Sequence, residues 1–387
     1  MAHRPGLSVA LSARSMKENQ GSRRAIGRMV AQAPTAPPQP PLAQPGGRDR
    51  FRSYLGKVGS GEHTSSGLSR EEAADALELM LNGEASPAQI GAFLIAHRIR
   101  RPEPQELTGM LDVYRRQGPQ LRSRRRALCF GIPFDGRSRT APLYPLTALV
   151  LASAGIPVVL QGGRRMPVKY GVTAMELFTA LGLQLSGRSL TWVQEGLDRW
   201  NLALVHQPDH FPAAEVLIPI REDIGKRPPL ASLELLWTPH HGDHLLVSGF
   251  VHPPTETRAW LALQLAGETE VLTIKGLEGS TDLPISRACV TGRPSASGDG
   301  RLILHPRDHG CYGDDPRWHD LDTWASQALA ALGGQGPLAT ALIWNAGTYL
   351  WQADHCDSQA AGLERCRELL QTGATLGHLH TMGQNHR

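Results

Sequence analysis

The segment CFGIPFDGRSRTAPLYP, residues 129–145, has the outline of a phosphate-binding loop. It follows a short apolar run, precedes a longer one, and contains Gly131, Asp135 and Gly136. Glycines in such loops let backbone N–H groups close on an anion. Between these glycines, however, lie a proline, which lacks an N–H group, and a bulky phenylalanine. The pattern leaves two hypotheses open: a loop that still holds a phosphorylated substrate, or the remnant of one.

The elements that must position this loop begin with a helical domain, which we predict over residues 50–118. SREEAADALELML begins at Ser69 and SPAQIGAFLIAHRI begins at Ser86, and each places Glu or Gln three residues after the serine. This spacing is the capping box that starts a helix. A third segment with apolar residues at helical spacing follows at 105–117.

From residue 119 to 376, short apolar runs alternate with helical patterns, which predicts an α/β domain with a mostly parallel sheet. The predicted strands are 127–132, 156–161, 203–206, 245–250, 270–275 and 301–305, and the predicted helices include 145–154, 172–182 and 258–266. The final residues, 377–387, are predicted to form a flexible tail.

The composition is typical of a globular protein in a reducing compartment. Hydrophobic residues make up 41% of the 387 residues and charged residues 20%. No run of about 18 apolar residues is present to span a membrane. The five cysteines are scattered without a CxxC pair, which argues against a zinc ribbon or a disulfide framework. We therefore expect a cytoplasmic protein that makes no membrane contact.

The positive charge is concentrated at the N-terminus. Residues 1–50 carry eight Lys and Arg against two acids, a net charge of +6, which leaves −2 on the rest of the +4 chain. Residues 1–49 contain few apolar side chains and a proline-rich stretch, so we predict a disordered basic extension. Its composition also resembles a transit peptide, which is the less favoured alternative. Any anion-binding surface in the folded part must therefore be a local patch.

Two long segments are specific enough to indicate a family: GEASPAQIGAFLIAHRIRRPEPQELTGM (83–110) and WNAGTYLWQADHCDSQAAGLERCRELLQTGAT (344–375). They resemble the helical domain and the closing segment of the anthranilate phosphoribosyltransferases and their relatives in glycosyltransferase family 3. The resemblance extends over about 51–376. It implies a helical domain joined to a mostly parallel α/β domain of the nucleoside phosphorylase and class II phosphoribosyltransferase type, with the substrate cleft between them.

That family binds phosphoribosyl pyrophosphate (PRPP) and Mg²⁺, so the resemblance also implies an anion-binding site. The positions that match its phosphate motifs are Gly131, Asp135, Gly136 and Thr140, then Gly162, Arg164 and Lys169, then Arg221 and Arg227. Arg137, Arg139 and Arg165 add positive charge to two loops that this fold places side by side. Arginine at a cleft rim suits phosphate oxygens, which it can bind through two parallel hydrogen bonds. The alternative is a solvated surface on which these charges pair with nearby acids.

Other motif positions depart from the family. Pro133 and Phe134 replace glycines of the first motif, and the magnesium pair falls on Thr281 and Asp282, with Glu278 as a substitute carboxylate. The framework segments match well while the substrate motifs do not, a division expected when a fold is kept and its chemistry is lost. The first loop also resembles a side branch of the family that binds nucleic acid as dimers.

Two histidine-rich segments contain metal-binding side chains, HHGDH at 240–244 and HPRDHGCYG at 305–313. A proline before the first segment and a glycine within it argue against a helix that would bring its histidines together. The second segment overlays a turn that is structural in the family. We favour structural roles for both.

We therefore predict a protein that binds nucleic acid or another polyanion in the former substrate cleft, without a required cofactor. The competing hypothesis is a divergent glycosyl- or phosphoribosyltransferase that acts on a phosphorylated small molecule. In it, Asp135, Asp282 and Glu278 hold the metal, Mg²⁺, while Arg164, Lys169 and Arg221 hold the phosphate and the acceptor. A purely structural partner protein is a third hypothesis. We also expect a homodimer formed through the helical domain, with helices 70–82 and 105–117 contributing.

Overall fold

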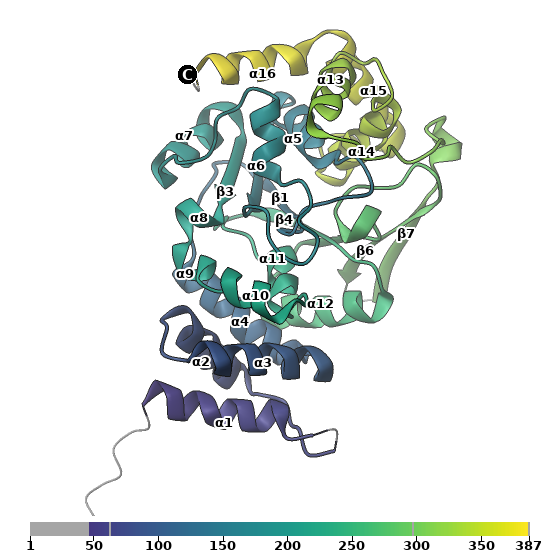
Figure 1. The fold of residues 1–387 in the computed structure, drawn as a ribbon. Coiled ribbons are helices and arrows are strands. Elements are labelled where there is room, and N and C mark those ends of the chain that lie inside the picture. Colours follow the sequence, from purple (N-terminus) through teal and green to yellow (C-terminus); the bar gives the residue numbers. More distant parts are fainter. Residues whose placement is uncertain (1–45, 62, 296–297, 386–387) are drawn as a thin grey trace, which may run out of the picture. The chain divides into compact units, whose positions relative to one another are not determined.

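A computed structural model gives the fold (Figure 1) and describes residues 46–61, 63–295 and 298–385. We predicted a disordered extension over residues 1–49, and residues 1–45 of it lie outside the described residues. Its last part differs from the prediction, because residues 47–49 begin helix α1, Gly47–Gly59. None of the described helices is both long enough and apolar enough to cross a membrane.

Helices α1 to α4 form the N-terminal bundle, with bounds Gly47–Gly59, Arg70–Leu81, Pro87–Arg100 and Pro104–Gln117. Both predicted capping boxes are present. The side chain of Ser69 accepts a hydrogen bond from the amide of Glu72, and that of Ser86 accepts one from the amide of Gln89. In return, the backbone amide of each serine donates to the side chain of that Glu or Gln. These bonds satisfy amides that a helix start leaves free, so α2 and α3 begin where the sequence predicts.

The α/β domain is built on a sheet whose strand order, within the described residues, is β3-β2-β1-β4-β5-β6-β7. The strands are β1 Ala127–Gly131, β2 Val158–Gly162, β3 Leu202–His206, β4 His244–Gly249, β5 Val271–Ile274, β6 Cys289–Ser295 and β7 Gly298–Leu304. Strands β1 to β5 run parallel, and β6 and β7 extend the sheet antiparallel. The predicted fold class, a helical domain with a mostly parallel α/β domain, is confirmed.

The remaining helices cover this sheet. They are α5 Tyr144–Ser153, α6 Ala174–Ala180, α7 Leu190–Trp200, α8 Gln207–His210, α9 Pro212–Glu215, α10 Ile218–Ile224, α11 Leu230–Leu236, α12 Pro253–Leu265, α13 Leu321–Leu332, α14 Ala339–Gln352, α15 Gln359–Gln371 and α16 Ala374–Asn385, with the 3-10 helices η1 Leu277–Gly279 and η2 Pro306–His309. Figure 1 shows α5 and α13 to α16 on one side of the strands, and α10 to α12 between the strands and the N-terminal bundle.

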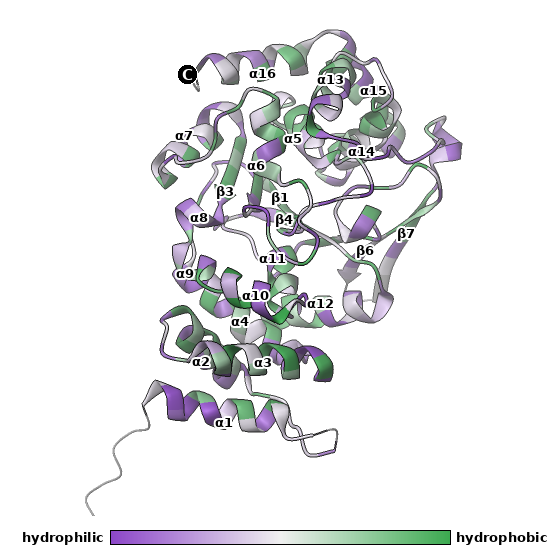
Figure 2. Cartoon of the chain, viewed as in Figure 1, coloured by the Kyte–Doolittle hydropathy of each residue, from purple (hydrophilic) through white to green (hydrophobic). Residues whose placement is uncertain are grey.

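The sheet separates two apolar cores, because alternate residues of a strand face opposite sides. In β1, Leu128 and Phe130 belong to the core shared with α5, α14 and α15, whereas Ala127 and Cys129 belong to the core shared with α2, α4, α11 and α12. Figure 2 shows β3 in the hydrophobic colour and hydrophilic patches along α1. Burial raises the pKa of the Cys129 thiol to about 12, as suits a small core residue.

The structure corrects one boundary at the C-terminus. The flexible tail predicted over 377–387 is instead helical as far as Asn385, in α16. Leu379 and Met382 of α16 are buried in the core beside α5, and the His378 Nε2 lies 3.0 Å from the carbonyl oxygen of Trp200. This helix therefore belongs to the folded α/β domain.

Candidate functional site

The loop that follows β1 makes a tight turn and crosses a second loop. The amide of Gly136 donates to the carbonyl of Pro133 at 3.1 Å, and Gly136 has a φ of 75°, which favours glycine. At the crossing, the amide of Val172 donates to the carbonyl of Arg137 at 2.9 Å. The two loops that were predicted to lie side by side are therefore joined by backbone hydrogen bonds.

Glycines in and beside the two loops lie close to protein backbone. A Cβ atom on Gly136 would lie 2.5 Å from the carbonyl carbon of Gly171, and one on Gly171 would lie 2.4 Å from the amide nitrogen of Arg137. A Cβ atom on Gly131 would lie 2.0 Å from a carbonyl oxygen of α11. Gly162 has ordinary room around it, with its nearest neighbour at 3.6 Å. The crossing of the loops and the packing of α11 thus require three of these four glycines, whether or not an anion binds.

Asp135 lies at the centre of a buried cluster of charges. Its fully buried carboxylate is 3.7 Å from Arg221 Nη2 and 3.9 Å from both Lys169 Nζ and Arg227 Nε. Arg221 Nη1 also contacts Glu234 Oε1 at 2.6 Å. Burial is the main cause that lowers the pKa of Lys169. Three cations thus surround two carboxylates, and neither Asp135 oxygen makes a hydrogen bond within the described residues.

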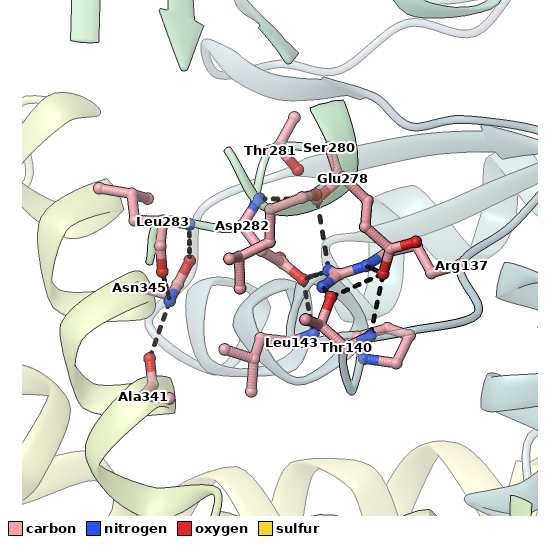
Figure 3. A network of polar contacts seen from close by, with 12 residues as sticks. Arg137, Thr140, Leu143, Glu278, Ser280, Thr281, Asp282, Leu283, Ala341 and Asn345 are labelled. Carbon is pink, nitrogen blue, oxygen red and sulfur yellow. Dashed lines mark hydrogen bonds and ion pairs between the residues drawn. The ribbon is translucent and has the colours of Figure 1, made fainter. Parts of the chain in front are cut away.

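Arg137 was predicted to lie at the rim of the cleft. It lies instead inside the protein, with 1% of its side chain exposed. Nη1 donates to the carboxylate of Asp282 and to the hydroxyl of Ser280, and Nη2 donates to the hydroxyl of Thr140 (Figure 3). Thr140 in turn donates to Glu278 through both its amide and its hydroxyl. The prediction that Arg137 and Thr140 are free to bind an anion is wrong, because protein carboxylates take up their donors.

The exposed arginines of the two loops are paired with acids. Arg139 is 78% exposed, and its Nε lies 3.6 Å from the carboxylate of Glu278. Arg164 contacts Glu215 at 2.5 Å and Arg165 contacts Glu176 at 2.7 Å. The alternative that the sequence left open, charges paired with nearby acids, therefore describes these side chains. Such exposed pairs are weak and can exchange their partners.

A cleft with a volume of about 840 Å³ lies between the helical bundle and the α/β domain, where the family resemblance implies the substrate cleft. Arginines line it from four elements: Arg98 from α3, Arg101 from the α3–α4 link, Arg227 from the α10–α11 link and Arg258 from α12. Arg98 donates to the carbonyl of Arg227 at 2.7 Å. The side chains of Arg101 and Arg258 have no hydrogen bond or ion pair with any residue in the described part of the chain.

The rest of the cleft is mostly apolar and its acids are engaged elsewhere. Leu107, Leu236 and Phe250 line it, with several prolines. Of its two glutamates, Glu256 accepts hydrogen bonds from Thr273 at 2.6 Å and from Arg301 at 2.7 Å. The other glutamate, Glu278, accepts hydrogen bonds from the amide and the hydroxyl of Thr140. The cleft therefore combines an apolar floor with uncompensated positive charge. Two features of the sequence point to this cleft: Arg227, a predicted anion-binding residue, and the run RIRRP at 98–102, which lies in the segment that resembles the family's helical domain.

Histidines of the first histidine-rich segment contact neighbouring side chains. His240 Nε2 lies 2.9 Å from the hydroxyl of Ser123, and His244 Nε2 lies 3.2 Å from Glu268. Burial is the main cause that lowers the pKa of His240 to about 4. Within the part of the chain that the structure describes, no group of three or more His, Cys, Asp or Glu side chains could hold a metal ion.

Comparison with known proteins places this architecture in a family. The model of the glycosyl transferase family, helical bundle domain, matches residues 52–118, and that of the glycosyl transferase family, a/b domain, matches residues 140–376. Fold and cleft thus define a two-domain protein of the transferase class. The chain belongs to this glycosyl transferase family.

Individual relatives share the whole arrangement at modest identity. The anthranilate phosphoribosyltransferase of Chromobacterium violaceum is 29% identical over 76% of this chain and 86% of its own length. That of Verminephrobacter eiseniae is 27% identical over 81% of this chain and 92% of its own. The crystal structure of the Thermus thermophilus enzyme superposes with a TM-score of 0.73 at 25% identity, covering 88% of this chain and 99% of that one. The Saccharomyces cerevisiae enzyme in complex with PRPP and Mg gives the same TM-score at 15% identity, covering 87% and 98%, a likeness of fold.

Proposed function

We propose that this chain binds single-stranded nucleic acid along the arginine-lined cleft. The observation that carries the proposal is the pair Arg101 and Arg258, which line a cleft of about 840 Å³ without a carboxylate partner among the described residues. An unpaired guanidinium gains free energy by binding a phosphate oxygen through charge-assisted hydrogen bonds. The apolar floor offers a surface for the faces of bases, which is how single strands bind without sequence preference.

The first loop favours this binding function over phosphoribosyl transfer. Phe134 stands at a position where the resembled motif has glycine, and its ring is 3% exposed in the packed loop. Pro133 has no N–H group to offer a pyrophosphate. The resemblance of this loop to the nucleic-acid-binding branch of the family supports the same function. We therefore expect no complementation of a tryptophan auxotroph that lacks anthranilate phosphoribosyltransferase.

A second function, transfer from a phosphorylated donor, is favoured by the cluster around Asp135. That cluster retains Lys169, Arg221 and Arg227, an excess of one positive charge, and carboxylate oxygens without hydrogen bonds in the described chain. Under this hypothesis the ligand is a phosphorylated small molecule and the relatives' activity is partly retained. PRPP binding to the purified protein would support it.

Fluorescence anisotropy with a labelled single-stranded oligonucleotide tests the first function. Replacing Arg101→Glu and Arg258→Glu together should weaken binding about tenfold or more, because two phosphate contacts become repulsive. The matched control is Arg164→Glu with Arg165→Glu, which changes the net charge equally at arginines that already pair with acids. We expect the control to weaken binding far less.

The outcomes separate the hypotheses. An equal loss in both double variants would show that net charge, and not the cleft, determines binding. A greater loss in the control variant would move the site to the two loops, where the sequence placed it. If PRPP with Mg²⁺ binds while the oligonucleotide does not, the transferase hypothesis is the better one.

A further inference from the structure

The family resemblance implies a Mg²⁺ site at Asp282 and Glu278, and their contacts show whether these residues fit a metal. Mg²⁺ demands near-octahedral oxygen ligands at about 2.0–2.1 Å and is usually held by one or two carboxylates that keep free oxygens for it. A fitting site would therefore need open carboxylate oxygens and uncompensated negative charge. Asp282 Oδ1 is buried without a hydrogen bond among the described residues, so one oxygen is open, but the charge condition is not met, because Arg137 and Arg139 lie beside the two carboxylates.

The guanidinium of Arg137 lies between the two carboxylates (Figure 3). Its Nη1 forms an ion pair with Asp282, and its Nε is 3.6 Å from Glu278 Oε1. All three side chains are buried, with exposed fractions of 1% for Arg137, 1% for Asp282 and 3% for Glu278. A divalent ion would have to displace a buried cation, which would then lose its partners in a medium of low polarity.

The other three oxygens of these carboxylates, Asp282 Oδ2 and both oxygens of Glu278, accept hydrogen bonds from protein donors. Glu278 Oε1 accepts from the amide of Thr140 at 2.9 Å, from its hydroxyl at 2.7 Å and from the amide of Arg139 at 3.2 Å. Asp282 Oδ2 accepts from the amide of Leu143 at 2.7 Å. The second family metal position is Thr281, whose side chain carries no charge. The residues present therefore do not fit a magnesium ion.

We infer that the guanidinium of Arg137 takes the place of the family's divalent cation. A fixed protein cation pairs with both retained carboxylates, ties the loop after β1 to the segment that follows β5, and makes ligand binding independent of divalent metal. The inference stands apart from the proposed function, because it concerns the metal position whichever ligand the cleft binds. Its test can therefore use the metal alone.

Titration of the full-length protein with Mn²⁺, followed by electron paramagnetic resonance of the free ion, tests this directly. The unchanged protein and Asp282→Asn should bind the same amount of Mn²⁺, because this carboxylate is not a metal ligand. Binding by the unchanged protein that is lost in Asp282→Asn would overturn the inference. This comparison does not depend on the folding of an Arg137 variant.

A second experiment looks for a gain of Mn²⁺ binding in a variant of Arg137. Arg137→Gln removes the cation that pairs with both carboxylates, so it should bind Mn²⁺ about tenfold or more tightly than the unchanged protein, and adding Asp282→Asn should abolish the gain. Arg139→Gln removes an equal charge from the same loop and should gain nothing. If Arg137→Gln folds, by circular dichroism, and gains no Mn²⁺ affinity, the inference is wrong. If it does not fold, the Asp282→Asn comparison decides.

Discussion

Burial distinguishes two pairs of arginines at and near the candidate site. Arg137 and Arg221 have side chains that are 1% and 3% exposed and pair with buried carboxylates. Arg164 and Arg165 are 61% and 53% exposed and pair with acids at the surface. A buried charge that loses its partner is left without solvent, whereas an exposed one is hydrated by water. The two groups should therefore respond differently to substitution.

Arg221→Ala should destabilise the protein by about 3–5 kcal/mol, because Glu234 and Asp135 then keep buried negative charge without their nearest cation. Arg164→Ala removes an exposed pair and should change the free energy of unfolding by less than about 1 kcal/mol. Urea denaturation of both variants measures the difference. Equal stability of the two variants would mean that water reaches the Asp135 cluster.

The stability of the helical bundle should depend on pH through Glu106. Burial alone raises the pKa of this carboxyl, but His97, Arg100 and the amide of Glu103 lower it to about 2, from an ordinary 4.5. Since the folded-state pKa is the lower one, the ionised carboxylate stabilises the fold above pH about 4.5, and this contribution is lost as the pH falls towards 2.

Glu106→Gln should therefore be less stable than the unchanged protein at pH 7, and its stability should fall less steeply between about pH 4.5 and 2. Urea unfolding at a series of pH values measures both slopes. The pKa of Glu278 is also lowered to about 2, so part of the slope should remain in the variant. Identical slopes in the two proteins would contradict a folded-state ionisation of Glu106.

At the scale of elements, the sequence predicts what depends on local contacts. The capping boxes at Ser69 and Ser86 lie within one turn, so spacing alone places the starts of α2 and α3. Strand β6 was not predicted because CVTGRPS contains a glycine and a proline, which an antiparallel strand near the sheet edge tolerates. Helix α16 contains two glycines and is stabilised by tertiary packing.

In the candidate site, too, the sequence does not predict contacts between residues that are far apart in the chain. Family motifs identified Asp135, Arg221 and Lys169 as neighbours, and the structure brings them together. They gave no indication that Arg137 turns inward, because its partner Asp282 is 145 residues away in the chain. The unpaired arginines of the cleft likewise come from elements far apart in sequence. Ion pairs between distant loops determine which arginines remain available to bind a ligand. The spacing of residues along the sequence does not predict these pairs.

The crossing of the two loops leads to an element-scale prediction. Gly136 and Gly182 have similar φ values of 75° and 85°, but only Gly136 has neighbours that a Cβ atom would meet. Gly182→Ala should cost about 1–2 kcal/mol from backbone conformation alone. Gly136→Ala should cost about 1–3 kcal/mol more, because the second loop must move. Thermal unfolding of both variants measures the difference, and equal costs would mean that the loops separate easily.

At the scale of the whole molecule, we predict a homodimer through the helical domain, as the family resemblance implies. Helices α2 and α4 pack against each other and are linked by the ion pairs of Arg116 with Glu78 and of Arg70 with Asp112. In the same helical domain, Ile99 of α3 is 77% exposed. Sedimentation velocity at micromolar concentration should show a species of twice the monomer mass. A monomer under these conditions would contradict the prediction.

The whole-molecule charge distribution determines how nucleic-acid binding should depend on salt. Residues 1–45 carry six Lys and Arg and one Glu, so this segment could bind anions without the cleft. Each phosphate contact on a single strand releases counterions and contributes about −0.7 to the slope of log affinity against log salt concentration. If the cleft is the site, contacts from Arg98, Arg101 and Arg258 should give a slope of about −2 in a shortened chain that begins at Gly46.

The same titration with Arg101→Glu and Arg258→Glu in the shortened chain should flatten that slope to about −0.7, the value for one remaining contact. Arg164→Glu with Arg165→Glu should leave it near −2, because those arginines already neutralise Glu215 and Glu176. Salt dependence that disappears with residues 1–45 and ignores both pairs of substitutions would assign the binding to the extension. The cleft would then have another ligand, and the unpaired arginines would have to be explained by that ligand's charge.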